Sequence, residues 1–210
     1  IMTVAVPYCD VRKFSITDGL AANTISDLKQ GKDNLMWFST WNGLSLYDGY
    51  EFHTFRDNPD DIDVLSTNRI LKIEPSYSNN VWCITYDHKL YVYDTHFCRF
   101  FAVGQKFNEE FNIDLRVSQV YPMKNGATWF TSEDGKYIIR SVGKAFDERN
   151  IDLIKVGEKG LRSGNVWYIH RDIHEREWVL TDKGAYVYNS KFPSKLLIDK
   201  AKWQELKMAK

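Results

Sequence analysis

Residues 34–52 read NLMWFSTWNGLSLYDGYEF, and this stretch decides the fold. Short runs of aromatic and aliphatic residues alternate in it with Gly, Asn and Asp, the residues that favour tight turns. Asn42-Gly43 accepts the positive φ angles of a two-residue hairpin turn, and Asp48-Gly49 supplies a second turn. We therefore expect four short antiparallel strands, at about 24–29, 35–40, 44–48 and 51–56.

The same pattern recurs along the chain, with steps of 45, 47 and 49 residues from the tryptophan of one copy to that of the next. Each copy has a Trp followed three residues later by Thr or Ser: Trp37 and Thr40, Trp82 and Thr85, Trp129 and Ser132, Trp178 and Thr181. Three copies carry a further glycine at the same spacing: Gly43, Gly135 and Gly184. Three copies begin with a leucine and an asparagine: Leu20 and Asn23, Leu65 and Asn68, Leu161 and Asn165. A pattern of this many features is poorly explained by chance.

A unit of four antiparallel strands every 45–49 residues is typical of a β-propeller blade. We predict an all-β fold of about four four-stranded antiparallel blades, forming an open or partial propeller in a single domain, 1–210. In each blade the Trp would fill the gap to the neighbouring blade. The Thr hydroxyl would cap the turn, and the Gly would permit its backbone angles. The blades are expected at roughly 14–56, 63–103, 113–146 and 160–200.

The first copy, NTISDLKQGKDNLMWFSTWNGLSLYDGYEFHTF at 23–55, resembles the repeat of the two-component-regulator propeller family. The preceding FSITDGLAANTI at 14–25 resembles the segment that leads into this repeat. The resemblance covers about residues 14–190. The third copy departs from the family's pattern, because Ser132 stands where Thr is usual and Arg140 where Tyr is usual.

The resemblance implies a periplasmic sensor region of a hybrid two-component system histidine kinase, as found in gut-dwelling Bacteroidetes. Members of that family respond to oligosaccharides released from polysaccharides, so an oligosaccharide ligand is implied as a partner. The family's rings have more blades than four, so we expect a fragment or a short member with exposed blade edges. Such edges favour self-association or pairing with missing blades of the parent chain. Residues 11–17, VRKFSIT, are expected to form a strand ahead of the first blade.

Composition excludes several classes of function. Lys plus Arg and Asp plus Glu number 28 each, and this balance argues against nucleic-acid binding, which favours a basic surface. No apolar run approaches the roughly 20 residues that span a bilayer, so we expect no membrane contact by this segment. The first residues lack the pattern of a signal peptide. The three cysteines, Cys9, Cys83 and Cys98, are expected to be buried thiols rather than disulfides or metal ligands.

The sequence contains no recognisable catalytic motif, and we expect no catalytic residue, no cofactor and no metal. His170 and His174 have a metal-like spacing, but a strand and a turn would place them on different faces. Glu175 and Glu177 are expected on a solvated turn and strand face. The acidic run at 58–64 lacks the 12-residue calcium-loop pattern, so a plain acidic loop is the preferred interpretation.

Binding is the activity that the sequence favours. In a propeller, the turns between second and third strands share a face with the connections between blades. Aromatic residues beside polar ones there would suit a sugar, since a flat apolar ring and hydrogen-bonding groups lie together. The candidate ligand-binding residues are Trp41, Asn42, Tyr86, Asp87 and His88. The alternative for Trp41 is that its ring folds back on a neighbouring blade.

Three hypotheses of function remain open at this stage. The first is an extracytoplasmic sensor segment that binds an oligosaccharide, or relays such binding to a histidine kinase. The second is a propeller scaffold for protein–protein interaction or dimerisation without a ligand of its own. The third is a propeller enzyme, such as a glycosidase or lyase, which needs two carboxylates about 5–10 Å apart in one cleft.

Overall fold

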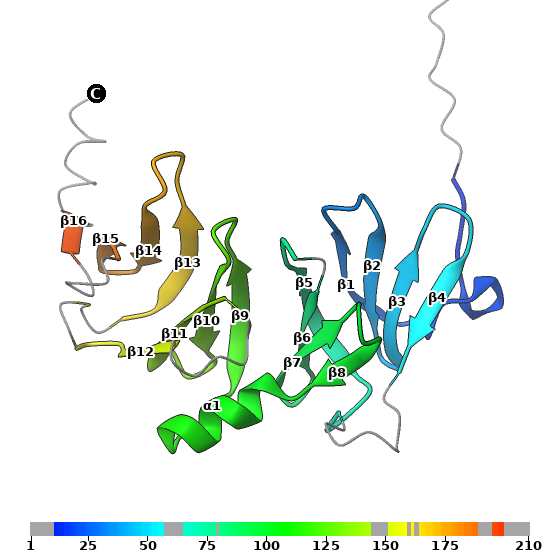
Figure 1. Ribbon diagram of the computed structural model, residues 1–210, viewed down its shortest axis with the longest axis horizontal. Helices are drawn as coiled ribbons and strands as arrows, with labels where there is room; N and C mark the ends of the chain where they lie inside the picture. The colour runs from blue at the N-terminus through cyan, green and yellow to red at the C-terminus, as the bar shows by residue number, and fades with distance from the viewer. Residues whose placement is uncertain are drawn as a thin grey trace, which may run out of the picture.

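The computed structural model describes residues 11–56, 65–78, 80–143, 151–158, 161, 164–188 and 195–199, the last of these only as backbone. The described strands form four antiparallel sheets of four strands, and in every sheet the strands pair in chain order. Figure 1 shows the sheets following one another along an arc, with the first and the fourth at its two ends. The prediction of four-stranded propeller blades in an open arrangement is confirmed.

The strands have the following bounds. The first sheet holds β1 (Ile25–Gln30), β2 (Met36–Thr40), β3 (Gly43–Tyr47) and β4 (Phe52–Phe55). The second holds β5 (Ile70–Pro75), β6 (Val81–Thr85), β7 (Leu90–Asp94) and β8 (Arg99–Phe101). The third holds β9 (Val117–Pro122), β10 (Ala127–Ser132), β11 (Tyr137–Val142) and β12 (Ile151–Lys155). The fourth holds β13 (Val166–Arg171), β14 (Glu177–Thr181), β15 (Gly184–Val187) and β16 (Lys195–Asp199).

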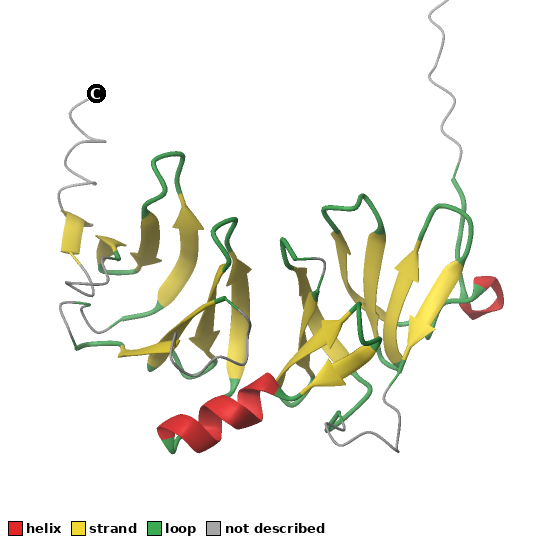
Figure 2. Ribbon diagram, viewed as in Figure 1, coloured by secondary structure: helices red, strands yellow, loops and turns green. Residues whose placement is uncertain are grey.

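Figure 2 shows that strand and loop dominate the described chain, with a helix between the second and third sheets. This helix, α1 (Val103–Phe111), packs Val103 and Phe107 into the core shared by those two sheets. A short 3₁₀ turn, η1 (Ile16–Asp18), precedes the first sheet. No helix in the described ranges has both the length and the apolar character that crossing a bilayer requires.

The repeated tryptophans lie between neighbouring sheets, as predicted. Trp37 is buried in a cluster with residues of the second sheet, among them Ile73 and Tyr93. Trp82 and Trp129 occupy the equivalent clusters between the second and third sheets and between the third and fourth. Burying so large an apolar surface at each junction is the main favourable term that holds the sheets together.

The Trp of the fourth sheet has a different environment. Trp178 is half-buried, and its indole N–H donates to Asp172 Oδ2 at 2.8 Å. The guanidinium of Arg176 lies 5.1 Å from the centre of its ring. In the described part of the chain, Trp178 therefore packs against its own sheet's first hairpin rather than against a following sheet.

The predicted role of the repeated Thr is also confirmed. Thr40 Oγ1 donates to the carbonyl of Gly43 at 2.9 Å and accepts from the backbone N–H of Asn42 at 3.0 Å. Thr181 makes the same two bonds across the turn of the fourth sheet. Ser132 keeps the function with different partners, because its hydroxyl accepts from the backbone N–H of Tyr137 at 2.9 Å. A buried hydroxyl at the end of the second strand thus holds each of these turns.

The turn between β2 and β3 differs from the expected Asn-Gly turn. Thr40 pairs with Gly43, so the two turn residues are Trp41 and Asn42, and Gly43 follows them with φ at 112°. This geometry, a turn followed by a glycine with positive φ, is a common alternative to the tight Asn-Gly turn. The N–H of Gly43 donates to the carbonyl of Asn68 at 2.8 Å, which ties the turn to the second sheet.

Arg140, at which the third copy departs from the repeat, is paired with a residue of the next sheet. Arg140, opposite Trp129 on β11, binds Glu177 of the fourth sheet through Nε at 2.6 Å and Nη2 at 3.0 Å. Glu177 also accepts from the Trp129 indole at 2.9 Å and from Asn125 at 3.0 Å. The expectation that Glu177 lies on a solvated face is wrong, because its carboxylate is buried between two sheets with four donated hydrogen bonds. Glu175, as expected, is exposed on the turn.

Two further expectations need correction or extension. Residues 11–15 form no strand, because Ser15 and Asp18 cap each other's backbone and start the 3₁₀ turn η1. The fourth strand of the third sheet, β12 at Ile151–Lys155, lies beyond the boundary at 146 expected for that blade. The predicted last strand near 195–199 coincides with β16.

The importance of the close contact at Gly43 can be tested by comparison with Gly49, a glycine of similar φ. A Cβ at Gly43 would lie 2.5 Å from the carbonyl oxygen of Phe55, whereas one at Gly49, where φ is 102°, would meet nothing within 4 Å. Gly49→Ala should lower the free energy of unfolding by about 1 kcal/mol through backbone strain alone. Gly43→Ala should cost clearly more, in urea unfolding followed by tryptophan fluorescence. Equal effects of the two variants would show that the close approach at Gly43 is unimportant.

The buried Glu177 predicts a pH dependence of stability. Burial alone would raise its pKa, but the hydrogen bonds and charge of Arg140 and the other donors hold the pKa of Glu177 below its ordinary value. The stability it contributes is therefore present above the unfolded-state pKa of about 4.3 and is lost as pH falls through the folded-state pKa. We expect the Tm to fall with acidification over this range, and to fall less steeply in Glu177→Gln.

Glu177→Gln should also destabilise the chain at neutral pH by about 3 kcal/mol, because it leaves the Arg140 charge buried without its partner. Glu158→Gln is the matched control, since Glu158 forms an exposed ion pair with Lys155 at 3.0 Å. The control should change stability by less than about 0.5 kcal/mol. If both variants unfold at the same urea concentration, the interaction of Glu177 with Arg140 does not stabilise the junction of the two sheets.

Candidate functional site

The first strands of all four sheets contribute to one cavity, which we call the central cleft. Its volume is about 750 Å³. Lys29 lies on β1 and Glu74 on β5, while β9 and β13 each contribute several successive residues. The turns that follow these strands complete the cleft with Tyr77, Lys124 and Ile173. Since these residues come from four separate repeats, only the curvature of the arc brings them together.

Aromatic side chains are prominent in the central cleft. The exposed fractions of Tyr77, Trp167 and Tyr168 are 41%, 60% and 50%. Tyr168 meets Tyr121 edge to face, with ring centres 5.5 Å apart, and stacks with His170 at 6.1 Å. Rings held in this way offer rigid, partly exposed apolar surfaces inside a polar cleft.

Charged side chains lie among these rings. Lys29 Nζ pairs with Glu74 at 3.0 Å. Partial burial lowers the pKa of Lys29, but the ion pair with Glu74 outweighs this and raises it overall. Arg171 pairs with Glu175 at 3.0 Å, and Lys124 lies exposed in the turn between β9 and β10. The central cleft therefore combines hydrogen-bond donors and acceptors with aromatic platforms.

A second cavity of about 800 Å³ lies between the second and third sheets. It shares Tyr77, Pro122, Met123 and Lys124 with the central cleft, so the two cavities adjoin at this side. Trp82, Phe97 and Phe101 line its apolar part. An extended ligand in the central cleft could continue into this second cavity past Tyr77 and Lys124.

The candidate ligand-binding residues from the sequence lie at the other end of the blades. Trp41, Asn42, Tyr86, Asp87 and His88 occupy the turns between second and third strands, whereas the turns of the central cleft join first and second strands. The two kinds of turn lie at opposite ends of each second strand. None of the five candidates lines the central cleft.

Trp41 and Tyr86 remain accessible in this turn region. Trp41 is 48% exposed, and the guanidinium of Arg69, just before β5, lies 5.0 Å from its ring centre. Its ring thus contacts the neighbouring sheet on one side and solvent on the other. The backbone N–H of Tyr86 donates to the carbonyl of Arg69 at 2.9 Å, so Arg69 connects the two aromatic residues.

Asp87 and His88 make structural contacts. Asp87 Oδ1 accepts from the hydroxyls of Thr85 at 2.6 Å and Ser66 at 3.0 Å. Burial would raise the pKa of Asp87, but these hydrogen bonds hold it below its ordinary value. His88 Nε2 lies 3.2 Å from Glu133, and its carbonyl accepts from the N–H of Val117 at 2.8 Å. Both residues therefore connect turns and sheets, whatever further role they have.

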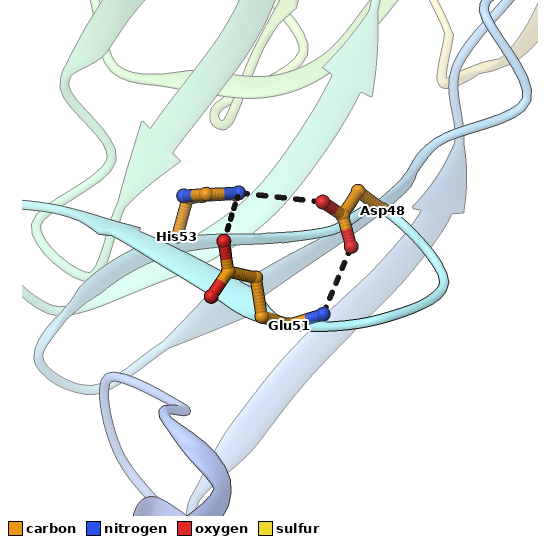
Figure 3. A group of neighbouring side chains, drawn as sticks. All are labelled: Asp48, Glu51 and His53. Atoms are coloured by element: carbon orange, nitrogen blue, oxygen red, sulfur yellow. Dashed lines mark hydrogen bonds and ion pairs between the residues drawn. The ribbon is translucent and has the colours of Figure 1, made fainter.

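Figure 3 shows a group of three possible metal-ligand side chains, with Asp48 and Glu51 on the turn between β3 and β4 and His53 on β4. His53 Nε2 lies 3.5 Å from Asp48 and 3.7 Å from Glu51, and all three residues are exposed. Hydrogen bonds from the backbone of Glu51 and Tyr50 lower the pKa of Asp48. Because Asp48 Oδ1 already holds the turn through these two bonds, the group is explained as a turn with a neighbouring histidine.

The remaining predicted side chains are scattered. His170 faces the central cleft from β13, whereas His174 lies in the next turn and is absent from the cleft lining. Cys83 is buried as expected, but the expectation for Cys98 is wrong, because its thiol is exposed. Cys9 and the acidic run at 58–64 lie outside the described residues.

Comparison with known proteins adds information about the fold. No family model matches the chain. A curated protein, "Histidine kinase P4" of Formosa agariphila, is 34% identical over 55 residues, which are 26% of this chain and 4% of that protein. The chain thus matches only a small part of this much longer relative.

Several solved structures resemble most of the chain, and two of them represent the range of proteins found. One is the extracellular domain of a hybrid two component system from B. thetaiotaomicron, at a TM-score of 0.50 and 16% identity over 90% of this chain and 32% of that one. The other is virginiamycin B lyase from Staphylococcus aureus, at a TM-score of 0.59 and 12% identity over 84% of this chain and 56% of that one. At these identities the similarity shows the fold alone, and this fold occurs both in an extracellular domain of a two component system and in a lyase. The chain therefore has the blade architecture found in the extracellular domain of this two component system and in the lyase.

Proposed function

We propose that this chain is a segment of the periplasmic sensor region of a hybrid two-component system, and that it binds an oligosaccharide derived from a polysaccharide. The observation that carries the proposal is the central cleft, where four repeats combine exposed aromatic rings with polar groups. The fold shared with an extracellular sensor domain and the short match to a histidine kinase support it.

A sugar suits this cleft for chemical reasons. A pyranose ring has apolar C–H faces that pack on aromatic rings and hydroxyls that exchange hydrogen bonds with charged or amide groups. Trp167 and Tyr168 offer the rings, while Gln119 and the Lys29–Glu74 pair offer donors and acceptors. A volume of about 750 Å³ is within the range of cavities that hold small organic ligands.

Signalling would follow from differential affinity. A ligand that contacts several sheets at once binds most tightly when the relative positions of the sheets allow all of its contacts to form. It would therefore shift the equilibrium between arrangements of the sensor region, by an amount set by the difference in affinity. A histidine kinase linked to this region would respond to that shift.

Substitution of two tryptophans tests whether the ligand binds in the central cleft or at the turns that the sequence predicted. Trp167→Ala should weaken oligosaccharide binding about tenfold, because losing an aromatic platform costs on the order of 1.5 kcal/mol. Trp41→Ala serves as its matched control, since both tryptophans are about half exposed. Calorimetric titration of both variants with the best ligand from a glycan screen measures the difference. The reverse pattern, with only Trp41→Ala weakened, would place the ligand at the turns.

The protein-interaction scaffold is the second candidate, and a separate observation favours it. Trp178 and Leu180 form an accessible apolar surface on the fourth sheet, with Tyr168 and His170 at its side, around a cavity of about 530 Å³. Leu180 is 37% exposed. Apolar surface of this kind is often covered by another protein surface.

Leu180→Lys tests this second candidate. If the surface mediates self-association, light scattering after size exclusion should show an oligomer for the parent chain and a monomer for the variant. Leu28→Lys is the matched control, because Leu28 is an exposed leucine on the first strand of the first sheet. A monomeric parent chain would count against association through this surface.

A further inference from the structure

The charges around the central cleft do not balance. Lys29 and Glu74 neutralise each other at 3.0 Å. Asp172 is neutralised by Arg176, which lies 2.7 Å from it. Two further cations lie on the lining: Arg171, whose partner Glu175 is outside the lining, and Lys124. The cleft thus has more positive than negative charge available to a ligand, although the whole chain is neutral.

Arg171 is the more deeply placed of these two cations. Its side chain is 15% exposed, and its Nη2 pairs with Glu175. That carboxylate is 77% exposed, so solvent weakens the attraction. The Nε of Arg171 is buried and has no hydrogen-bond partner among the described residues. The ion pair with Glu175 engages Nη2, so the five N–H donors of the guanidinium are not all used by it. A guanidinium binds a carboxylate through two parallel hydrogen bonds.

Lys124 provides a second cation at the side where the central cleft adjoins the second cavity. It lies in the turn between β9 and β10, and it makes no ion pair with any residue that the structure describes. Tyr77 lines both cavities together with Lys124. The ammonium of Lys32 lies 4.6 Å from the centre of the Tyr77 ring. This side of the cleft is therefore positive as well as aromatic.

We propose that the central cleft binds an acidic oligosaccharide, whose anionic groups pair with Arg171 and Lys124 while its rings pack on Trp167 and Tyr168. This inference rests on the proposed function and narrows its ligand class. The anion is a carboxylate, as in a uronic acid, or a sulfate ester, because both carry negatively charged terminal oxygens that accept parallel hydrogen bonds from a guanidinium and attract an ammonium.

The ligand class is tested by calorimetric titration of the chain with three oligosaccharides of equal length: one of uronic acids, one sulfated and one neutral. We expect at least one acidic oligosaccharide to bind about tenfold or more tightly than the neutral one, since hydrogen bonds to charged groups are the stronger kind. This preference should shrink as salt is raised. The arm that binds identifies carboxylate or sulfate as the anion.

The site is tested by variants with a matched control on the same sheet. Lys124→Gln and Arg171→Gln should each weaken acidic binding severalfold and leave neutral binding unchanged. Lys136→Gln should have no effect, because Lys136 lies at the other end of β10 and pairs with Asp134 at 3.0 Å. Circular dichroism checks the fold of Arg171→Gln, and the exposed Lys124 provides the test if that variant unfolds.

The outcomes separate this inference from the function on which it rests. Binding of the neutral oligosaccharide as tightly as the acidic ones would overturn the acidic preference and leave the oligosaccharide sensor intact. Acidic binding that Lys124→Gln and Lys136→Gln weaken equally would overturn the site. Absence of binding to all three, and to a wider glycan screen, would overturn the proposed function and this inference with it.

Discussion

Each of the first three sheets buries the Trp of its second strand against the sheet that follows. A four-stranded sheet with two partly apolar faces cannot bury both by itself, so neighbouring repeats supply one another's cover. The Trp fixes the spacing between sheets, the Thr hydroxyl holds the adjoining turn, and Gly43 brings that turn to the next sheet. The direction in which successive sheets lie, and hence the arc, follows from these junctions.

The junction of the third and fourth sheets keeps this architecture with different chemistry. Opposite the repeated Trp the other sheets have Leu46, Val92 and Val187, so by strand register Arg140 replaces an aliphatic residue rather than the Tyr expected from the repeat. Glu177 of the following sheet supplies the matching charge. The carboxylate also accepts from the indole of Trp129, so the Trp stays buried and its N–H is bonded. Arg140 alone would be an unpaired buried charge in the third sheet. Glu177 of the fourth sheet pairs with it, so the two sheets still pack together.

The two ends of the blades have different chemistry as a result. At the turns between second and third strands, side chains such as Asp87 and His88 are engaged in holding turns and neighbouring sheets. Along the first strands, which have a neighbour within the sheet on one side only, several rings and charged groups stay accessible and converge on the central cleft. Binding chemistry is therefore more available where fewer side chains are committed to the junctions.

The sequence alone determined the blade architecture, because the Trp of each repeat, the Thr or Ser after it and the Gly of three repeats are local signals that recur at a nearly constant interval. It also predicted the roles of Trp37 and Thr40, which depend only on strand alternation and turn geometry. Tertiary structure decided what no single repeat contains. The burial of Glu177 depends on Arg140 in another sheet, and the central cleft depends on the angle between sheets that brings Tyr77, Trp167 and Arg171 together. Trp167 and Tyr168 stand where the other first strands have Ser26 and Asp27, Leu71 and Lys72, and Ser118 and Gln119. Two neighbouring aromatic residues at these positions were a sequence signal that pointed to the cleft.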